Sequence, residues 1–259
     1  MTYNPAVMRI MREVQFALVS LGGSSVGGAL WPELAIRVFV GGPIDPRTGF
    51  VANASSIDEV VRESAVPLLQ RWWAEKGAAA FQPAELMGEL YTAVAERLGG
   101  LALERLELHP GPHRHWAIHA GGSSMVVFTQ IFEFAAGHRL HMPGFSDEEN
   151  HRNFGKCANP GGHGHNYVVE VSVSGTPDPA RGPLVDLPVF ERTVRERVID
   201  RFDHKHLNTD CPEFAERNPT VENLAQVIWG LLAGAFNGCV LSCIRVWETP
   251  RTHAEYRGE

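Results

Sequence analysis

The chain has 259 residues with 44% apolar and 20% charged side chains, which excludes a disordered or fibrous chain and leaves room for one large domain or two smaller ones. Its formal net charge of −7 argues against a surface for nucleic acid or anionic lipid, because such surfaces depend on summed positive charge. The longest apolar run is too short for a membrane span, no secretion signal starts the chain, and the four cysteines contain no CxxC pair, so we expect a cytoplasmic protein without a membrane partner.

The sequence repeats itself, with a constant offset of 133 residues between positions 30–72 and 163–205. Self-similarity of this kind is typical of a duplicated structural unit. We therefore expect two tandem units, the first over residues 1–120 and the second over residues 121–259. Matching segments are Val38–Val40 with Val171–Val173, Gly42 with Gly175, Asp45–Pro46 with Asp178–Pro179, and Val61–Glu63 with Val194–Glu196.

Hydrophobic period and turn residues predict the order strand, strand, helix, helix, strand, strand in each unit. In the first unit a helix starts at Gln82–Pro83 and a late strand covers Leu101–Leu108. The stretch 109–124 is rich in turn residues and predicts a linker, and a glycine-rich stretch over 21–29 follows the first strand. In the second unit we expect strands at Phe132–His138, Tyr167–Ser174, Ile244–Glu248 and His253–Arg257, and helices at Phe190–Phe202 and at Pro219–Phe236, the latter capped by Asn218.

The histidines and cysteines place metal chemistry in the second half of the chain, because all of them lie at or beyond residue 109. His163 and His165 stand at positions i and i+2 of a strand, where side chains project from one face. His138 ends the adjoining strand. Three imidazole nitrogens with an open fourth position are typical of a catalytic zinc site, and no carboxylate completes an iron site and no Met or Cys is placed for copper.

Three further features of the second unit carry candidate acid–base chemistry. Cys157 lies six residues before His163, in a loop with enough turn residues to fold over a metal, where a thiol can act as a base. Asp203 and His204 offer either a proton relay or a helix end stabilised by a charged histidine. Glu248 is a buried carboxylate that needs a partner, such as two N–H donors of a ligand ring.

The first unit lacks these side chains, so it is not expected to bind zinc in the same way. At the same offset, Leu30 and Pro32 stand at the positions of the two strand histidines, Gln70–Arg71 stand at the position of the Asp–His pair, and Ser20 is the counterpart of His138.

Seven segments of the second unit form an ordered series of motifs: Phe132–Leu140, Ser146–Asn150, Phe154–Cys157, His163–Tyr167, Phe202–Lys205, Asn218–Asn223 and Trp247–Thr249. Together they resemble the 6-pyruvoyl-tetrahydropterin synthase family over residues 128–259. The resemblance implies the T-fold, in which a four-stranded antiparallel sheet with two helices on one face assembles into a barrel. The expected fold class is therefore α+β, with two tandem T-fold (ββααββ) units, the first a degenerate copy, and barrel closure makes a homo-oligomer the expected state.

The resemblance also implies a lyase reaction, in which 7,8-dihydroneopterin triphosphate is converted into 6-pyruvoyl-tetrahydropterin and triphosphate without an external redox cofactor. A bound Zn2+ would bind the side-chain hydroxyls of the pterin and acidify its carbon-bound protons. The implied roles are zinc ligation by His138, His163 and His165, base chemistry by Cys157, proton relay by Asp203 and His204, anchoring of the pterin ring by Glu248, and lining of the same pocket by Thr220 and Glu222. Triphosphate contacts cannot be assigned, and Arg139, Lys156 and Lys205 are candidates only as cations near the motifs.

Two other functions stay open. The related 6-carboxy-tetrahydropterin synthase of the queuosine pathway shares the scaffold, zinc site and substrate but releases acetaldehyde, and the five residues between Cys157 and His163 favour the pyruvoyl enzyme. A protein that binds a pterin or purine without turnover is the second alternative, because the first unit has lost its site. The histidines at 109, 113, 115 and 119 are interpreted as part of the linker, with a second metal there as a lesser alternative.

Overall fold

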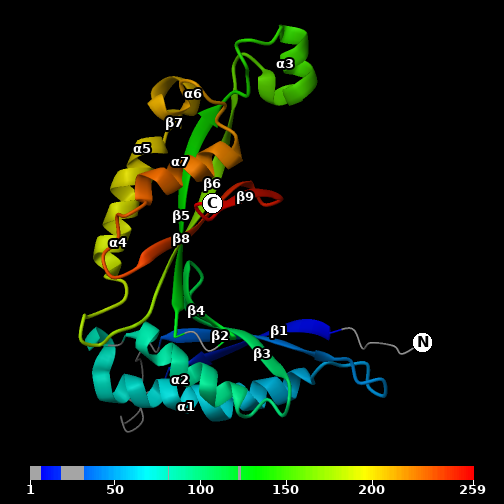
Figure 1. Cartoon of the computed structure of the whole chain (residues 1–259), viewed down its shortest axis with the longest axis vertical. Coiled ribbons are helices and arrows are strands. Elements are labelled where there is room, and N and C mark those ends of the chain that lie inside the picture. The colour runs from blue at the N-terminus through cyan, green and yellow to red at the C-terminus, as the bar shows by residue number, and fades with distance from the viewer. Residues whose placement is uncertain (1–6, 19–31, 81, 122–123) are drawn as a thin grey trace, which may run out of the picture. The chain divides into compact units, whose positions relative to one another are not determined.

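The computed structural model describes residues 7–18, 32–80, 82–121 and 124–259, and these residues form two compact units. Unit 1 comprises the described part of residues 1–128 together with Gly175–Leu184, and unit 2 comprises Thr129–Ser174 and Val185–Glu259. Within the described residues, no helix is long and apolar enough to cross a membrane. Each unit is described on its own below (Figure 1).

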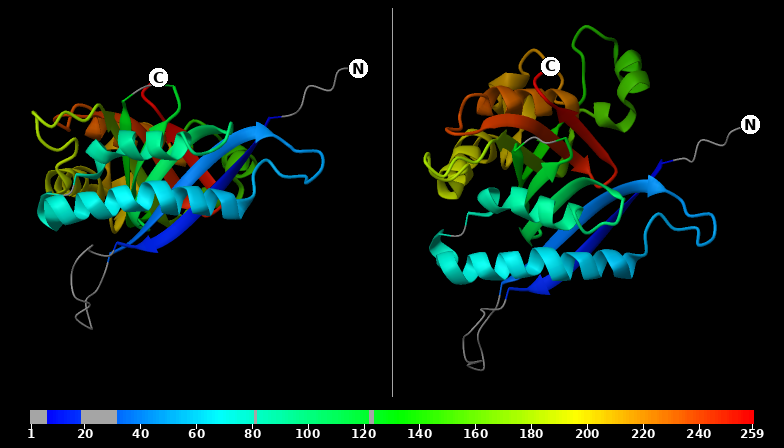
Figure 2. Two further views of the ribbon diagram at one scale, coloured as in Figure 1. Left: turned by 90° about the horizontal axis from the view of Figure 1, so that it is seen from below. Right: turned by 60° about the horizontal axis from the view of Figure 1, so that its bottom comes forward.

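Unit 1 is an antiparallel sheet with two helices against one face (Figure 2). Alternate residues of the second strand, Ile36, Val38 and Val40, are fully buried, as a strand with one covered face requires. The strands, neighbours in chain order, are β1 (Val7–Ala17), β2 (Glu33–Pro43), β3 (Ala102–Gly111) and β4 (Arg114–His119), and the helices are α1 (Ala54–Ala80) and α2 (Pro83–Ala95).

Unit 2 is also α+β, with four longer strands in the order β5, β6, β8, β9 and helical segments between β6 and β8. A two-residue strand, β7 (Lys205–His206), pairs in parallel with β5. The other elements are β5 (Val126–His138), α3 (Asp147–Phe154), the 3-10 turn η1 (Gly155–Ala158), β6 (His163–Gly175), α4 (Leu187–Val194), the π-helical turn η2 (Arg195–Ile199), α5 (Asp200–Phe202), α6 (Leu207–Asp210), the 3-10 turn η3 (Pro212–Phe214), α7 (Val221–Leu232), β8 (Val240–Thr249) and β9 (Thr252–Tyr256).

The core of unit 2 follows the two periods that the sequence contains. On β6, Tyr167, Val169 and Val171 are fully buried, and the residues between them are less buried, which is the alternation of a strand. The helix expected over Phe190–Phe202 is confirmed, since α4, η2 and α5 form one continuous helical run whose four apolar positions are all buried. Helix α7 packs on β8 and β9.

The start of α7 differs from the prediction. The helix begins at Val221, and its N-cap is Thr220, whose hydroxyl accepts a hydrogen bond from Asn223 N at 3.3 Å. Asn218, the expected cap, instead accepts a long-range hydrogen bond from His141 N at 2.8 Å. The helix also ends earlier, at Leu232. A single-sequence pattern could not distinguish two candidate caps two residues apart, because the choice depends on a distant partner.

The predicted linker over 109–124 is wrong for most of its length. Strand β3 continues to Gly111, and β4 covers Arg114–His119, so this stretch forms the last hairpin of unit 1. Trp116, Ala117 and Ile118 are all buried in β4, so burial does not alternate along this strand, and the turn residues of the segment obscured it. The glycine-rich stretch 21–29 lies outside the described residues.

The chain between β5 and β6 forms an excursion that ends in the loop of Cys157. It contains α3, which starts with a capping box between Ser146 and Glu149. The side chain of Asn150 is 1% exposed and accepts a hydrogen bond from Met142 N while donating to three backbone carbonyls of the same excursion. A buried amide with this many partners holds the turn before α3 in one conformation.

The cap at Thr220 predicts a stability difference. Thr220→Ala should lower the free energy of unfolding by about 1 kcal/mol, because an N–H at the start of α7 loses its acceptor, whereas Thr220→Ser should retain most of it. The measurement is urea unfolding followed by circular dichroism. Thr92→Ala is the matched control, since the exposed Thr92 hydroxyl only bonds back to Gly88 O within α2. Equal losses in Thr220→Ala and Thr92→Ala would contradict the capping role.

Candidate metal centre and cleft

The three histidines predicted as metal ligands lie together in unit 2. His138 is the last residue of β5, and His163 and His165 are the first and third residues of the neighbouring strand β6. One ring nitrogen from each lies within 4.8 Å of the others, and this is the one such group among the described residues. The sheet produces this cluster because two adjacent strand ends present side chains to the same side.

A hydrogen bond to the backbone of Pro219 fixes the orientation of the His138 ring. Its Nδ1 lies 2.7 Å from the carbonyl oxygen of Pro219, which the ring N–H can donate to, and its Nε2 lies 3.0 Å from His163 Nε2. His138 is 1% exposed, so this contact is shielded from water. A backbone acceptor behind one ring nitrogen selects the tautomer whose other nitrogen carries a lone pair, as in histidines that bind metals.

Burial favours the neutral form of His138 and His163. Burial is the main cause that lowers the pKa of His138 to about 4, and burial followed by the charge of His165 lowers the pKa of His163. His163 Nδ1 is also buried without a protein hydrogen-bond partner among the described residues. Imidazoles that converge in this way can hold a cation in their neutral form, because protonated rings would repel both each other and the ion.

Tyr167 connects the histidines to two other candidate residues, although the sequence pattern predicts no separate role for it. It is fully buried on β6, its hydroxyl lies 3.4 Å from His138 Nδ1, and its ring makes an edge contact with His165. Burial, and then the charges of Glu248 and Cys157, raise the pKa of Tyr167 far above its usual range. Its phenol therefore stays protonated, and both acidic side chains lie close enough to act on it.

Cys157 lies in η1, directly after α3, and is half-buried. Its carbonyl accepts a hydrogen bond from Leu140 N at 2.9 Å, so the loop is attached to the chain that leaves β5. The other thiols have different surroundings. Burial raises the pKa values of Cys211, Cys239 and Cys243 to about 11, which keeps those thiols protonated and unreactive.

Asp203 and His204 form a hydrogen-bonded pair along the edge of β5. Asp203 Oδ1 accepts from Ala135 N at 2.9 Å, His204 N donates to Ala135 O at 2.7 Å, and the Asp203 carboxylate lies 2.8 Å from His204 Nδ1. The Ala135 N–H, followed by the His204 side chain, lowers the pKa of Asp203. His204 has a φ of 56°, a conformation that non-glycine residues rarely adopt, and its side chain is exposed.

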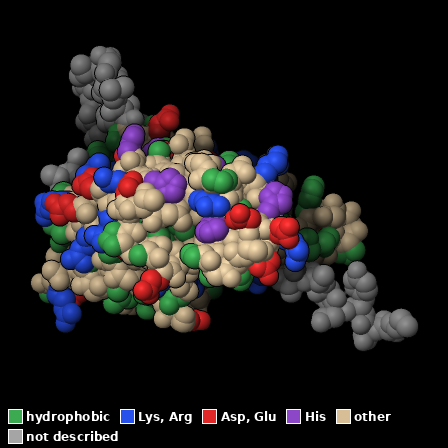
Figure 3. Space-filling view, turned by 90° about the horizontal axis from the view of Figure 1, so that it is seen from above, with side chains coloured by type: hydrophobic (Ala, Val, Ile, Leu, Met, Phe, Trp, Pro, Cys, Tyr) green, Lys and Arg blue, Asp and Glu red, His purple; other side chains and the backbone are tan. Residues whose placement is uncertain are grey.

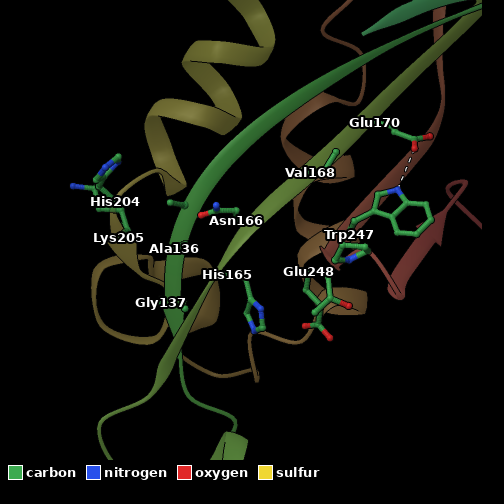
Figure 4. Close-up of a pocket in the computed structure, with 14 residues that line it drawn as sticks. Ala136, Gly137, His165, Asn166, Val168, Glu170, His204, Lys205, Trp247 and Glu248 are labelled. Atoms are coloured by element: carbon green, nitrogen blue, oxygen red, sulfur yellow. Dashed lines mark hydrogen bonds between the residues drawn. The ribbon is translucent and has the colours of Figure 1, made fainter. Parts of the chain in front are cut away.

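A cleft of about 1140 Å3 lies along β5, β6 and β8. His165, His204 and Glu248 line it, while the other predicted site residues are not among its lining. Figure 4 shows His165 and Glu248 pointing to the same side of their strands, while Trp247 turns toward Glu170, with which it shares a 3.1 Å hydrogen bond. Of the two residues expected near the ring anchor, Glu222 is exposed, and Thr220 directly follows the proline that orients His138.

The surface at the α3 and α6 end of unit 2 is mixed in charge. Figure 3 shows histidine side chains exposed on this side among acidic and basic ones. No single charge dominates the visible face, which agrees with recognition of a small ligand in a cleft rather than of a long polyanion.

Fold and site together define an α+β protein with a three-histidine centre suited to a metal ion beside an open cleft. The family model described as 6-pyruvoyl tetrahydropterin synthase matches residues 128–259. The chain belongs to the 6-pyruvoyl tetrahydropterin synthase family, a family of lyases. The match leaves the first 127 residues outside.

Individual relatives cover the same half of the chain. The 6-pyruvoyl tetrahydrobiopterin synthases of Homo sapiens and Poecilia reticulata are each 44% identical over 131 residues, which is 51% of this chain and 90% and 89% of theirs. The solved structure of the Caenorhabditis elegans 6-pyruvoyl tetrahydropterin synthase is 37% identical and covers 52% of this chain and 96% of its own, with a TM-score of 0.49.

The histidine cluster predicts selective metal binding. The protein purified with zinc should carry about one ion per chain, and His165→Ala should lose most of it, because two imidazoles retain a small fraction of the affinity of three. Inductively coupled plasma mass spectrometry after dialysis measures the content. His113→Ala is the control, since His113 is exposed in the hairpin of unit 1. Unchanged zinc in His165→Ala, or loss in His113→Ala, would contradict the assignment.

Proposed function

We propose that this chain is a zinc-dependent 6-pyruvoyl-tetrahydropterin synthase, which converts 7,8-dihydroneopterin triphosphate into 6-pyruvoyl-tetrahydropterin and triphosphate. One observation carries the proposal. The Tyr167 hydroxyl lies 3.4 Å from His138 Nδ1, its ring contacts His165, and the charges of Cys157 and Glu248 both act on its phenol, so the ligation site, the thiol and the ring-binding carboxylate belong to one region of unit 2. Membership of the lyase family and the names of its 44% identical relatives support the same reaction.

Zinc is the metal we assign to His138, His163 and His165, since three imidazole ligands with room for a fourth ligand suit it. When bound, zinc supplies Lewis acidity toward the side-chain oxygens of the substrate. The protein residues then perform the remaining steps. Cys157 removes a carbon-bound proton of the substrate side chain, while the protonated phenol of Tyr167 lies 3.4 Å from His138 Nδ1.

Proton relay and ring binding fall to the residues on either side. Asp203 keeps the imidazole of His204 oriented through their 2.8 Å contact, and His204 faces the cleft, where it can pass a proton to or from a substrate. Glu248, in the same cleft, accepts two N–H donors of the pterin ring. We assign Thr220 and Glu222 to the same pocket, where the Thr220 hydroxyl still has its own proton to donate.

Unit 1 supports a second part of the proposal, that residues 1–120 are a degenerate T-fold copy and residues 121–259 the catalytic one. The pairing of β2 with β3 shifts register between Phe39 and Val40, and the pairing of β6 with β8 shifts between Ser172 and Val173, which are 133 residues further along. A bulge repeated at the offset of the sequence repeat supports common descent, because bulges are features that families retain.

The final hairpins agree as well. Leu106 pairs with Ile118 between β3 and β4, and Ile244 pairs with Tyr256 between β8 and β9, a constant separation of 138 residues. Pro32 stands where the second unit has His165, and Ser20 and Leu30 lie outside the described residues. We propose that unit 1 contributes to a barrel of several chains, in which strand edges such as those of β1 and β9 are covered by other copies.

The assembly can be tested by light scattering. The native protein should have the mass of several chains, and the mass of a single chain would contradict the proposed barrel.

The product assay tests the reaction itself. The zinc-loaded protein should turn 7,8-dihydroneopterin triphosphate into pyruvoyl-pterin and triphosphate by mass spectrometry, and Cys157→Ala should lower kcat by about 10²- to 10⁴-fold with zinc retained, because the base is lost. Cys239→Ala is the matched thiol control. Carboxy-pterin with acetaldehyde would move the protein to the related carboxy enzyme, and ligand binding without any product would identify a pterin-binding protein.

The ring anchor gives an independent test. Glu248→Gln keeps the size of the side chain but removes its charge, so one ring N–H faces an amide in place of a carboxylate. A charged hydrogen bond contributes about 1.5–3 kcal/mol, and we therefore expect KM to rise roughly 10- to 150-fold in initial-rate measurements. Glu216→Gln, at an exposed position, is the control. An unchanged KM in Glu248→Gln would remove Glu248 from the binding site.

A further inference from the structure

Arg139 directly follows His138, and its side chain is engaged with the loop of Cys157. The guanidinium Nε donates to the carbonyl oxygen of Ala158 at 2.8 Å, and the next backbone N–H, from Leu140, donates to the carbonyl oxygen of Cys157 at 2.9 Å. Two consecutive residues after β5 therefore hold two consecutive carbonyls of the loop, that of Cys157 itself and that of the next residue. Ala158 is buried, so its carbonyl has little access to water as an alternative partner.

The backbone of Arg139 is itself fixed. Asn208, in α6, accepts a hydrogen bond from Arg139 N at 2.8 Å and donates one to Arg139 O at 3.0 Å. The Asn208 side-chain amide thus makes the same pair of hydrogen bonds that the backbone of a facing residue makes between two antiparallel strands. Both backbone polar groups of Arg139 are hydrogen-bonded to Asn208, so its main chain is held in place. The hydrogen bond from its side chain to Ala158 O therefore also restrains the loop of Cys157.

The three cations considered for the triphosphate differ in their surroundings. Lys205 lines the cleft, and Lys156 is exposed. Arg139 is half-buried, and its Nε already serves a protein carbonyl. The guanidinium in this position therefore acts as a structural donor to the Cys157 loop through Nε, whereas neither lysine side chain makes a contact of this kind within the described residues.

We propose that Arg139 is a positioning residue, which holds Cys157 at a fixed place relative to the histidine cluster. The inference rests on the proposed function in that it takes Cys157 as the base. It differs from the interpretation of Arg139 as an anion-binding residue, since a positioning residue affects the chemical step and the reactivity of one thiol, whereas an anion-binding residue affects substrate affinity.

Kinetics separate the two roles. Arg139→Met keeps the apolar stem and removes the donor, and we expect kcat to fall about 10- to 100-fold with KM within about threefold of wild type, because a displacement of the order of 1 Å at a reacting group has that effect. Arg139→Lys retains one donor and should recover part of kcat. Arg152→Met is the matched control, as Arg152 is exposed on α3 within the same excursion and has no place in the site.

Thiol reactivity tests the positioning without any turnover. Iodoacetamide labelling at one pH, followed by peptide mass spectrometry, gives the rate at Cys157 separately from the other three cysteines. Release of the loop in Arg139→Met should raise that rate about threefold or more, with unchanged labelling in Arg152→Met. Zinc content and thermal unfolding confirm that each variant is folded, and Arg139→Lys replaces Arg139→Met in both assays if the latter does not fold.

The outcomes are distinct. A fall in kcat together with faster labelling of Cys157 supports the positioning role. A raised KM with unchanged kcat and unchanged labelling overturns it and makes Arg139 an anion-binding residue. If the wild-type protein shows no turnover, the proposed function fails, and labelling alone decides on Arg139: faster labelling in the variant supports the positioning, and an unchanged rate overturns it.

Discussion

The site depends on one buried hydrogen bond, from the ring of His138 to the carbonyl of Pro219. It joins the end of β5 to the residue before the N-cap of α7, so the sheet and the helix that covers it are connected at the metal-binding end. It also decides which ring nitrogen faces His163. Without it the ring could rotate or exchange tautomers, and the convergence of three lone pairs would be lost. Helix α7 packs on β8 and β9 through its own apolar face, and the hydrogen bond to His138 attaches the chain before this helix to the metal-binding end of β5.

The parts of the site that follow a short period could be predicted from the sequence. His163 and His165 had to share a face because they are two apart on a strand, and His138 had to join them because it continues the buried row of Phe134 on the neighbouring strand. The alternation of side chains along β5 and β6 therefore determines both which residues enter the core and which residues form the histidine cluster. The side of the sheet that buries the aromatic residues of unit 2 is the side on which the ligands lie.

The parts that depend on long-range polar contacts could not be predicted. Asn218 is the predicted helix cap, yet its amide oxygen accepts a hydrogen bond from His141 N, far away in sequence. Thr220 is the N-cap residue instead. The two functions are chemically alike, since each is an amide or hydroxyl oxygen that accepts a backbone N–H. A sequence pattern shows that such an acceptor is present, but it does not show which N–H donates to it. For the same reason Tyr167 and Arg139 carried no separate structural role until their partners were known.

The sheets of the two units have similar paired residues on the face that does not form the core, whereas among the described residues only unit 2 has the three-histidine cluster on the other face. On the face that alternates with the core, Arg37 pairs in register with Glu107 in unit 1, whereas Glu170 pairs with Arg245 in unit 2, the same positions with the charges exchanged. Ring pairs follow the same rule, with His109 stacked near His115 and Trp247 near His253. A sheet face needs complementary neighbours, and either order of charges satisfies that need. A metal site needs three particular side chains, so similar registers and paired neighbours in the two units do not require a metal site in both.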